Sequence, residues 1–510
     1  MNILEELKKH TETYGNRIAI KSGEESLTYS QLEEYSDKLA TWLHRSFGDS
    51  KTPVVVYGHK NPYMIVCFFA CVKAGKAYCP QDISIPDTRV LDTVDCVNPE
   101  IIFQVEGDID FSNQNVCSLE TIKSIINEEK EEAQKNWWVK PEDVYYIIFT
   151  SGSTGKPKGV QITFDCLNNY LDWSVALGGP KEDKDGMNFG NQAPFSFDLS
   201  VMDLYTSLAS GGTLHTMTKK MQEDYAAMFE HFEKSDLNVW VSTPSFADMC
   251  LSDKKFCKDL LPNLKMFLFC GEVLTTATVK KLHERFPNTK VINTYGPTES
   301  TVAVTDVEIT PELLDNIISL GKSLPVGHEK PGTRIEIRGE DGTVLKDSEQ
   351  GEIIIIGDTV STGYYMRDDL TQKAFFTCDI DGKKYRAYHT GDAGYLKDGQ
   401  LYYNGRIDLQ VKLNGYRIEI EDIENNMLRL EQITQAVVIP NVREGKVRSL
   451  TAFVTGDIGQ KSALEFSREI KAGLKEFLPA YMIPKKIKYI ESIPMNNNGK
   501  ADRKYLGGLL

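Results

Sequence analysis

Short apolar runs alternate with longer, helix-length segments along the first 320 residues of the chain. Residues 53–57 are a valine-rich run typical of a strand, and residues 63–74 form a nearly continuous apolar segment that stops before Gly75. Strands separated by helices pair in parallel, because a parallel connection needs a crossover segment of this length. The pattern predicts an α/β fold whose large N-terminal domain contains parallel sheets.

The pattern changes between residues 320 and 408, where the apolar segments shorten and glycines multiply. Residues 333–338 alternate between apolar and charged positions, and residues 352–356 are a short apolar run, which is typical of strands joined by turns. We therefore expect a β-rich subdomain over about 320–408, at the end of an N-terminal domain that spans residues 1–408.

The remaining residues, 409–510, predict a small α+β C-terminal domain. Its expected elements are a helix over 419–430, strands over 436–439 and 450–454, and a helix over 463–477. This part carries 16 Lys and Arg residues against 12 Asp and Glu residues, a net charge of +4, whereas the rest of the chain carries −19. We therefore expect the C-terminal domain to present a different surface from the rest of the protein.

The overall composition narrows the class of protein. With 41% hydrophobic residues, 26% charged residues and a net charge of −15, the chain is typical of a globular protein that binds neither nucleic acid nor anionic membranes in general. No apolar stretch approaches the ~20 residues that cross a bilayer. The first nine residues lack the order of a signal peptide, so we expect a cytoplasmic protein. The ten cysteines include no Cys-x2-Cys pair, which argues against a structural metal site.

Polar residues follow directly after four apolar runs between residues 140 and 320. One run ends at Phe149, and the others end within residues 240–244, 266–272 and 291–297. In open α/β sheets, ligands bind at the carboxyl ends of the strands. We therefore expect these four ends to form one crevice at one edge of a sheet.

The first run leads into residues 150–159, with the sequence TSGSTGKPKG. Its glycines allow tight turns, and its hydroxyls, lysines and backbone N–H groups favour a phosphate ligand. It is not a Walker loop, since Lys156 precedes a proline, and it is not a nucleophile elbow, since Ser151 stands two positions before Ser153 where glycine is required. A flexible Gly- and Ser-rich linker is the alternative interpretation.

Five short motifs occur together in the chain: TSGSTGKPKG at 150–159, NTYGPTE at 293–299, YHTGD at 388–392, YNGR at 403–406 and NGK at 498–500. In this order they resemble the adenylate-forming superfamily, which includes acyl-CoA synthetases, luciferases and the adenylation domains of peptide synthetases. The resemblance spans nearly the whole chain. It implies that a carboxylate displaces pyrophosphate from ATP to give an acyl adenylate, and that a thiol then takes the acyl group.

The resemblance also implies roles for individual residues. Lys500 would be the catalytic lysine that contacts the substrate carboxylate and the α-phosphate, and Glu299 would hold Mg²⁺. Asp392 would bind the ribose hydroxyls, Tyr295 would stack against the adenine, and Arg406 would support the ribose or the phosphates. The residues expected to bind ATP are Thr150, Ser151, Gly152, Ser153, Thr154, Gly271, Asn293, Thr294, Tyr295, Gly296, Pro297, Thr298, Asp392, Tyr403, Arg406 and Lys500.

Taken singly, these residues also have purely structural explanations. Lys500 could be an exposed tail lysine, Glu299 a carboxylate at a helix N-terminus, and Asp392 a turn residue. The joint occurrence of five motifs in order favours the catalytic interpretation over these alternatives.

Two residues bear on the choice of substrate. Asp198, in the apolar context FSFDLS, matches the aspartate with which amino-acid-activating members hold the α-ammonium group; its alternative is the N-cap of a following helix. Cys270, in FCGE, resembles the D-alanine–D-alanyl carrier protein ligase family, which charges a carrier for D-alanylation of teichoic acids. In that family the cysteine contacts the small side chain and helps to select the D enantiomer. Val302 would close the same site with its backbone, and Lys500 would complete it.

The resemblance implies D-alanine and ATP as substrates and a separate, phosphopantetheinylated D-alanyl carrier protein as the partner, since we expect no carrier domain after residue 510. Such carriers are typically acidic, so the net charge of +4 favours the C-terminal domain as the docking face. Asp408 resembles the hinge about which this domain turns between the two half-reactions. The alternatives are activation of another small amino acid, an acyl- or aryl-CoA synthetase, and a nucleotide-binding regulator without catalysis.

Overall fold

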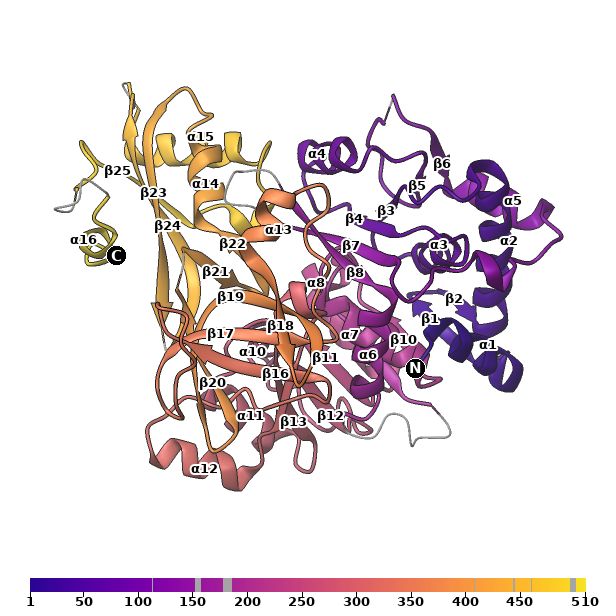
Figure 1. The fold of residues 1–510 in the computed structure, drawn as a ribbon. Coiled ribbons are helices and arrows are strands. Elements are labelled where there is room, and N and C mark those ends of the chain that lie inside the picture. The colour runs from indigo at the N-terminus through magenta and orange to yellow at the C-terminus, as the bar shows by residue number, and fades with distance from the viewer. Residues whose placement is uncertain are drawn as a thin grey trace. The chain divides into compact units, whose positions relative to one another are not determined.

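The computed structural model describes residues 1–111, 113–151, 157–177, 186–407, 409–443, 445–459, 461–495 and 501–510. This part of the chain forms two compact units. The first contains residues 1–83, 97–148 and 159–404, and the second contains residues 84–96, 149–158 and 405–510. Their helices and strands are labelled in Figure 1.

The first unit contains a nine-stranded sheet in the order β15-β14-β13-β12-β11-β9-β10-β1-β2. The strands from β13 to β1 pair in parallel, and the strands beyond them at each end are antiparallel. The parallel centre confirms the fold class that the sequence predicts. The strands are β1 (Ile18–Ser22), β2 (Glu25–Thr28), β9 (Asn188–Asn191), β10 (Thr213–Thr216), β11 (Val239–Ser242), β12 (Met266–Phe269), β13 (Lys290–Tyr295), β14 (Thr305–Glu308) and β15 (His328–Glu329).

A second sheet has the order β6-β5-β3-β4-β7-β8, and its pairs from β6 to β7 are parallel. The strand expected over 53–57 is its central β3, shifted by one residue. The strands are β3 (Val54–Gly58), β4 (Tyr78–Asp82), β5 (Ile102–Gln104), β6 (Val116–Ser118), β7 (Val144–Thr150) and β8 (Lys158–Thr163).

A third sheet, drawn in orange tones in Figure 1, is antiparallel, with the order β16-β17-β19-β18 and β20 paired to β19. The strands expected over 333–338 and 352–356 are its first two members. The strands are β16 (Thr333–Arg338), β17 (Gly351–Gly357), β18 (Phe375–Ile380), β19 (Lys383–Lys397) and β20 (Gln400–Arg406).

Helices connect the parallel strands, as a parallel sheet requires. The expected buried helix is α3, which begins at Pro62 after an Asn61 cap and is followed by Gly75 at φ +77°. The helices of the first unit are α1 (Ile3–Tyr14), α2 (Tyr29–Phe47), α3 (Pro62–Lys73), α5 (Leu119–Glu128), α6 (Phe164–Ser174), α7 (Leu199–Ala209), α8 (Lys219–Glu223), α9 (Tyr225–Ser235), α10 (Pro244–Cys250), α11 (Thr276–Arg285), α12 (Pro311–Ser319) and α13 (Asp368–Ala374), with 3₁₀ turns at Lys135–Trp137 and Thr298–Ser300.

The second unit has a mixed three-stranded sheet, β23-β24-β25, and a separate hairpin, β21-β22. The strands expected over 436–439 and 450–454 are the centre of a longer hairpin, because the polar ends of β23 and β24 also pair. The expected helices are α14 and α15, each shorter than predicted. The elements are α4 (Asp87–Val97), β21 (Gln410–Leu413), β22 (Tyr416–Glu419), α14 (Ile420–Met427), β23 (Ile433–Arg443), β24 (Lys446–Gly456), α15 (Ala463–Leu474), β25 (Lys486–Tyr489) and α16 (Arg503–Gly507), with a 3₁₀ turn at Ala480–Met482.

None of the helices among the described residues is both long and apolar enough to span a membrane.

Two histidines lie together in the first unit, His215 on β10 and His231 on α9, with ring centroids 6.5 Å apart. Burial, and then His231 and Lys21, lower the pKa of His215 to about 4, although Asp236 raises it. Burial and Lys21 lower the pKa of His231 to about 4 as well. In the unfolded chain these two histidines are protonated near pH 6.5. The unfolded chain therefore binds more protons than the folded chain between about pH 6.5 and 4. The folded state therefore loses stability as the pH falls through this window.

We expect the variant His215→Asn to lose less stability than the parent protein between pH 6.5 and 4, by about 3 kcal/mol. The measurement is the free energy of unfolding from denaturant titrations at several pH values. The control is His328→Asn at an exposed histidine. We expect this variant to show the same change in the free energy of unfolding with pH as the unsubstituted protein. Equal slopes for His215→Asn and the parent would contradict the assignment.

Candidate functional site

Three of the four predicted strand ends lie side by side at the carboxyl edge of the nine-stranded sheet. Strands β11, β12 and β13 are neighbours, and Ser242, Phe269 and Asn293 stand in one row of their registers. The expectation that all four ends share one sheet is wrong, because β7, which contains Phe149, pairs with β4 in the second sheet. An apolar run predicts a strand but not its partner. The edge of β11 to β13 is therefore the framework of the candidate site.

The segment 293–302 leaves β13 and holds this edge together. The Thr294 hydroxyl donates to the Phe269 carbonyl (2.8 Å), which fixes β13 to the end of β12. The Asn293 side chain donates to the Pro325 carbonyl (2.8 Å). Gly271, which follows β12, has φ +93°, a conformation that glycine adopts without strain. The predicted ATP residues in this stretch thus have their backbone positions set by side-chain hydrogen bonds.

Asp198 is buried, and its Oδ2 accepts a hydrogen bond from the Thr298 hydroxyl (2.7 Å). It occupies the N-cap position of α7, but within the described residues no backbone N–H of that helix donates to its side chain. Asp198 therefore stands at the expected N-cap position but does not cap the helix with its side chain. The carboxylate instead faces the segment that follows β13.

Cys270 lies at the end of β12, 3% exposed, and its thiol contacts the Val302 carbonyl oxygen at 3.6 Å. This contact places the two residues that the sequence assigns to the amino-acid side chain and to the closing backbone next to each other. Asp198 contacts segment 293–302, which contains Val302, through its hydrogen bond with Thr298. The structure thus brings together three of the four predicted substrate residues.

Asp392 is also buried, with 1% of its surface exposed, and its Oδ2 accepts from the Tyr295 hydroxyl (2.6 Å). It lies inside β19, so the alternative that it is a turn residue is wrong. Residues 390–392 stand opposite Ile353 alone, a bulge in the pairing of β17 and β19. Bulges re-aim side chains, and this one directs Asp392 toward Tyr295. The ring of Tyr403 lies 5.8 Å from that of Tyr295, which adds a third predicted nucleotide residue.

Glu299 is fully buried in the 3₁₀ turn after β13, where the Tyr364 hydroxyl donates to its Oε1 (2.8 Å). Across the described ranges, no group of three or more His, Cys, Asp and Glu side chains could hold a metal ion by itself. A lone carboxylate fits Mg²⁺ when the ion takes its other ligands from phosphates and water. The donor set is therefore consistent with the predicted Mg²⁺ residue.

Several predicted residues are not placed with this group. Gly152, Ser153, Thr154, Asp408 and Lys500 lie outside the described residues. Thr150, Ser151 and Arg406 belong to the second unit. There, the Ser151 hydroxyl donates to the Arg417 carbonyl (2.9 Å) and accepts from the Glu419 N–H (3.2 Å).

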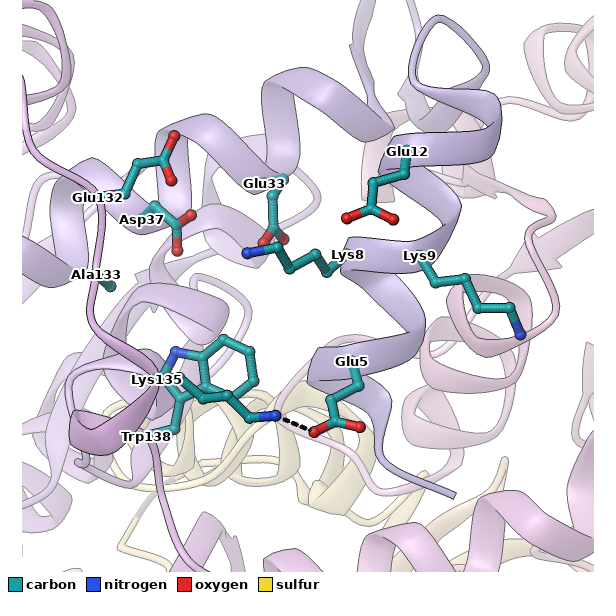
Figure 2. A pocket seen from close by; sticks show the side chains of 10 residues that line it. All are labelled: Glu5, Lys8, Lys9, Glu12, Glu33, Asp37, Glu132, Ala133, Lys135 and Trp138. Carbon is teal, nitrogen blue, oxygen red and sulfur yellow. Dashed lines mark hydrogen bonds and ion pairs between the residues drawn. The ribbon is translucent and has the colours of Figure 1, made fainter.

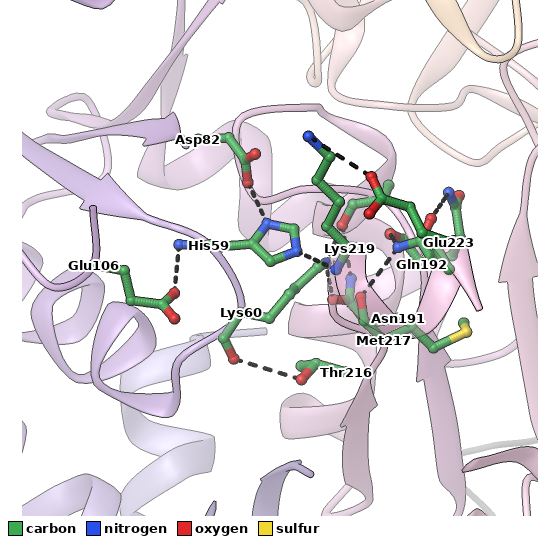
Figure 3. A network of polar contacts seen from close by, with 12 residues as sticks. His59, Lys60, Asp82, Glu106, Asn191, Gln192, Thr216, Met217, Lys219 and Glu223 are labelled. Carbon is green, nitrogen blue, oxygen red and sulfur yellow. Dashed lines mark hydrogen bonds and ion pairs between the residues drawn. The ribbon is translucent and has the colours of Figure 1, made fainter. Parts of the chain in front are cut away.

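Figure 3 shows a buried polar network that the sequence did not single out. The ammonium of Lys60 donates to the Asn191 side chain and to the Ala193 carbonyl, and it lies 4.5 Å from the centroid of the Phe195 ring. Asn191 also donates to Asp203 (2.8 Å). Burial lowers the pKa of Lys60 to about 8, while Asp203 and Asp82 raise it. The network fixes the segment that leads from β9 to Asp198.

His59 extends the network between two strands. Its Nδ1 contacts Asp82 (2.7 Å), and its Nε2 accepts from the Lys219 backbone N–H (2.8 Å), so the proton lies on Nδ1. His59 and Lys60 directly follow Gly58, the last residue of β3. Polar residues after a strand end, the signal used for the other four ends, would have identified them.

A pocket of about 370 Å³ lies elsewhere on the first unit, between α1, α2 and the chain near residue 135 (Figure 2). Its lining mixes both charges, and Lys135 pairs with Glu5 at 2.5 Å. None of the predicted site residues lines it. The lining residues are Glu5, Lys8, Lys9, Glu12, Glu33, Asp37, Glu132, Ala133, Lys135 and Trp138.

Comparison with known proteins adds family relationships. Residues 7–365 match the family of AMP-binding enzymes, and residues 422–500 match the AMP-binding enzyme C-terminal domain. The chain is 46% identical to a D-alanine–D-alanyl carrier protein ligase from Bacillus licheniformis over 507 residues, and 45% identical to one from Bacillus anthracis over 511 residues; each match covers 99% of both chains.

Solved structures show the same fold at lower identity. One is PA1221, a peptide synthetase protein with adenylation and carrier domains: TM-score 0.84, 23% identity, covering 99% of this chain and 84% of that one. Another is the Vibrio cholerae adenylation domain AlmE, in complex with glycyl-adenosine-5′-phosphate: TM-score 0.81, 22% identity, covering 99% and 97%.

We expect Lys60→Met to lower the free energy of unfolding by about 3–5 kcal/mol, because it removes the cation from a buried polar network. Denaturant titration measures the change. The control, Lys219→Met, removes a lysine whose side chain is 55% exposed and changes stability by less than about 0.5 kcal/mol. Equal changes in the free energy of unfolding for the two substitutions would show that the Lys60 network does not stabilise the fold more than an exposed lysine does.

Proposed function

Because this chain belongs to the AMP-binding enzymes, and within them to the D-alanine–D-alanyl carrier protein ligases, we propose that it activates D-alanine with ATP and transfers it to the phosphopantetheine thiol of a separate carrier protein. The first half-reaction yields D-alanyl-AMP and pyrophosphate. The proposal extends to the D-alanylation of teichoic acids and to a cytoplasmic location, which the sequence led us to expect.

The observation that carries the proposal is the placement of Asp198. Its carboxylate is buried, makes no capping hydrogen bond to its own helix and accepts one from Thr298, on the same segment as Val302, which contacts Cys270. A buried carboxylate is costly unless a cation or donor group accompanies it. The α-ammonium group of an amino acid supplies such a cation, whereas fatty and aryl acids do not. This favours an amino acid over the acyl- and aryl-CoA alternatives.

The size of the amino acid follows from Cys270 and Val302. The thiol lies 3.6 Å from the Val302 carbonyl oxygen, and a side chain at position 270 narrows the site, which favours a small group such as methyl. The identity of the relatives supports the same substrate. In this arrangement Asp198 and the Val302 carbonyl hold the ammonium group, and Cys270 contacts the methyl group.

The nucleotide would lie along the other half of segment 293–302. Asp392 binds the ribose hydroxyls, Tyr295 lies against the adenine, and Glu299 holds Mg²⁺. The ion, when bound, offsets the negative charge of the phosphates. Lys500, which lies outside the described residues, contacts the carboxylate and the α-phosphate, where charge builds as pyrophosphate leaves.

In the second half-reaction, the carrier thiol attacks the carbonyl carbon of D-alanyl-AMP, the bond to the phosphate oxygen breaks, AMP leaves and the thiol proton is released. We propose that residues 409–510 form a mobile domain with its hinge at Asp408, and that this domain turns between the two steps. The carrier docks on its basic surface, where Lys485 and Lys486 are exposed.

The first half-reaction is tested by ATP–pyrophosphate exchange with D-alanine, L-alanine, glycine, D-serine and a fatty acid. We expect strong exchange with D-alanine. Asp198→Asn should lower kcat/KM for D-alanine about a hundredfold, since it removes the charge that pairs with the ammonium group, and leave KM for ATP unchanged. The control is Asp172→Asn at an aspartate whose side chain is 55% exposed. Exchange with fatty acids alone would contradict the proposal.

The docking face is tested by transfer to a carrier protein. Lys485→Glu combined with Lys486→Glu should slow transfer by about three- to tenfold, more at low than at high salt, because charges at the rim of an interface steer association. Pyrophosphate exchange should not change. The matched control reverses Lys254 and Lys255, two adjacent exposed lysines of the first unit. Equal transfer rates for both double variants would rule out this face.

The same two assays test the hinge. Asp408→Pro should preserve pyrophosphate exchange more than transfer, because proline restricts the backbone rotation that only the second step requires. Equal loss of both activities would contradict the hinge assignment.

A further inference from the structure

The chain makes an unusual turn at residues 301–303, which begins two residues after Glu299, the proposed Mg²⁺ residue. Thr301 and Val302 have φ values of +62° and +69°, and the Ala303 N–H donates to the Thr301 carbonyl at 2.8 Å. A hydrogen bond between residues i and i+2 around a positive φ defines the rarer, strained form of the γ-turn. A β-branched residue at positive φ is an outlier in any context. Two such residues in succession are strained.

Contacts on several sides hold this strained turn in place. The Thr301 hydroxyl donates to the Thr359 carbonyl (2.8 Å), and the Ser361 N–H donates to the Glu299 carbonyl (2.8 Å). Thr301, Val302 and Ala303 are almost fully buried. Such strain persists only where the surroundings over-determine the backbone, and it concentrates at functional sites.

Gly296 packs directly against the backbone of the γ-turn. A Cβ at this position would lie 2.5 Å from the Ala303 Cα and 2.8 Å from the Val302 carbonyl oxygen. Both distances are shorter than real Cβ contacts, so a side chain at 296 would push the turn away. The glycine of the NTYGPTE motif therefore has a packing reason here, in addition to its predicted place beside ATP.

The strained conformation of the turn fixes the direction of the Val302 carbonyl. Its oxygen lies over Gly296 and 3.6 Å from the Cys270 sulfur. Under the proposed function, this oxygen accepts a hydrogen bond from the substrate ammonium group, while Cys270 contacts the methyl group. The γ-turn thus sets the distance between the positions of two substituents on the same substrate carbon.

Enantiomers differ only in the arrangement of the same four groups. If one acceptor could move, L-alanine would shift its ammonium group and still place its carboxylate and methyl group acceptably. A site discriminates between enantiomers only when moving an acceptor costs free energy. A buried, strained and over-determined turn cannot move without disrupting Gly296, Thr359 and Glu299 together.

We propose that the γ-turn at 301–303 is a positioning device that adds to Cys270 in making this site selective for D-alanine over L-alanine, acting through the Val302 carbonyl rather than through the valine side chain. This inference rests on the proposed function and adds to it a second origin of its stereochemical preference. Thr301 and Gly296 are positioning residues in this scheme, and Val302 contacts the substrate only with its backbone.

The test compares Val302→Ala with Val302→Gly, which remove nearly the same side-chain volume but differ in their tolerance of positive φ. Elsewhere glycine destabilises a buried position relative to alanine, whereas at positive φ the order reverses. We expect Val302→Gly to melt at a higher temperature than Val302→Ala, which reports the strain. The ratio of kcat/KM for D-alanine to that for L-alanine, from pyrophosphate exchange, should be about tenfold lower in Val302→Gly than in Val302→Ala, because glycine frees the carbonyl.

Equal D-to-L ratios in the two variants, or a higher melting temperature for Val302→Ala, would overturn the inference. The same Ala and Gly pair at Thr301 repeats the comparison if a variant at 302 does not fold. Absence of D-alanine exchange in the parent protein would instead contradict the proposed function, and the melting comparison would still report whether the turn is strained.

Discussion

The candidate site depends on burying three carboxylates around one segment of chain, residues 293–302. Asp198, Glu299 and Asp392 are between 0% and 7% exposed, and each accepts a hydrogen bond from a hydroxyl group. A hydroxyl offsets part of the cost of desolvation but leaves the negative charge in place. Such carboxylates suit ligands that bring cations or donors, which in the proposed reaction are an ammonium group, a metal ion and ribose hydroxyls.

Segment 293–302 connects all three carboxylates. Tyr295 contacts Asp392, Thr298 contacts Asp198, and Glu299 lies in the segment itself. The segment leaves a parallel strand, forms a short 3₁₀ turn and then the γ-turn, so its side chains point in several directions over a few residues. One stretch of chain can therefore serve the nucleotide and the amino acid together, which a regular helix or strand could not do.

Two sets of contacts make the candidate site rigid. The Lys60 network fixes the chain that leads to Asp198, and Gly296 with Thr359 fixes the γ-turn at Val302. A small substrate offers few contacts, so discrimination has to come from groups that cannot adjust to the wrong ligand. Buried polar networks and strained turns both supply this resistance, at a cost in stability that the two large cores of the first unit offset.

Much of the fold and of the site could be predicted from sequence. Hydrophobic period and residue propensity predicted the strand near 53–57, the helix near 63–74 and the strand 333–338. The motifs alone led to the prediction of Asp198, Cys270 and Asp392 as site residues. Lys60 also follows a strand end, but it lies outside residues 140–320, where that signal pointed to the candidate site, and it was missed. Tyr364 carried no signal, since its contact with Glu299 joins residues 65 positions apart.

The sequence by itself determined which residues are predicted to bear the chemistry, because motifs fix residue types at local spacing. Only the tertiary structure decided that β7 belongs to a different sheet from β11, β12 and β13, and that Asp198 turns from its helix to Thr298. It also decided the conformation of Thr301 and Val302. Two β-branched residues favour extended backbone by their own propensity, and the contacts of Gly296, Thr359 and Ser361 force them to positive φ instead. Local preference is worth less free energy than packing, so strain of this kind is not encoded locally.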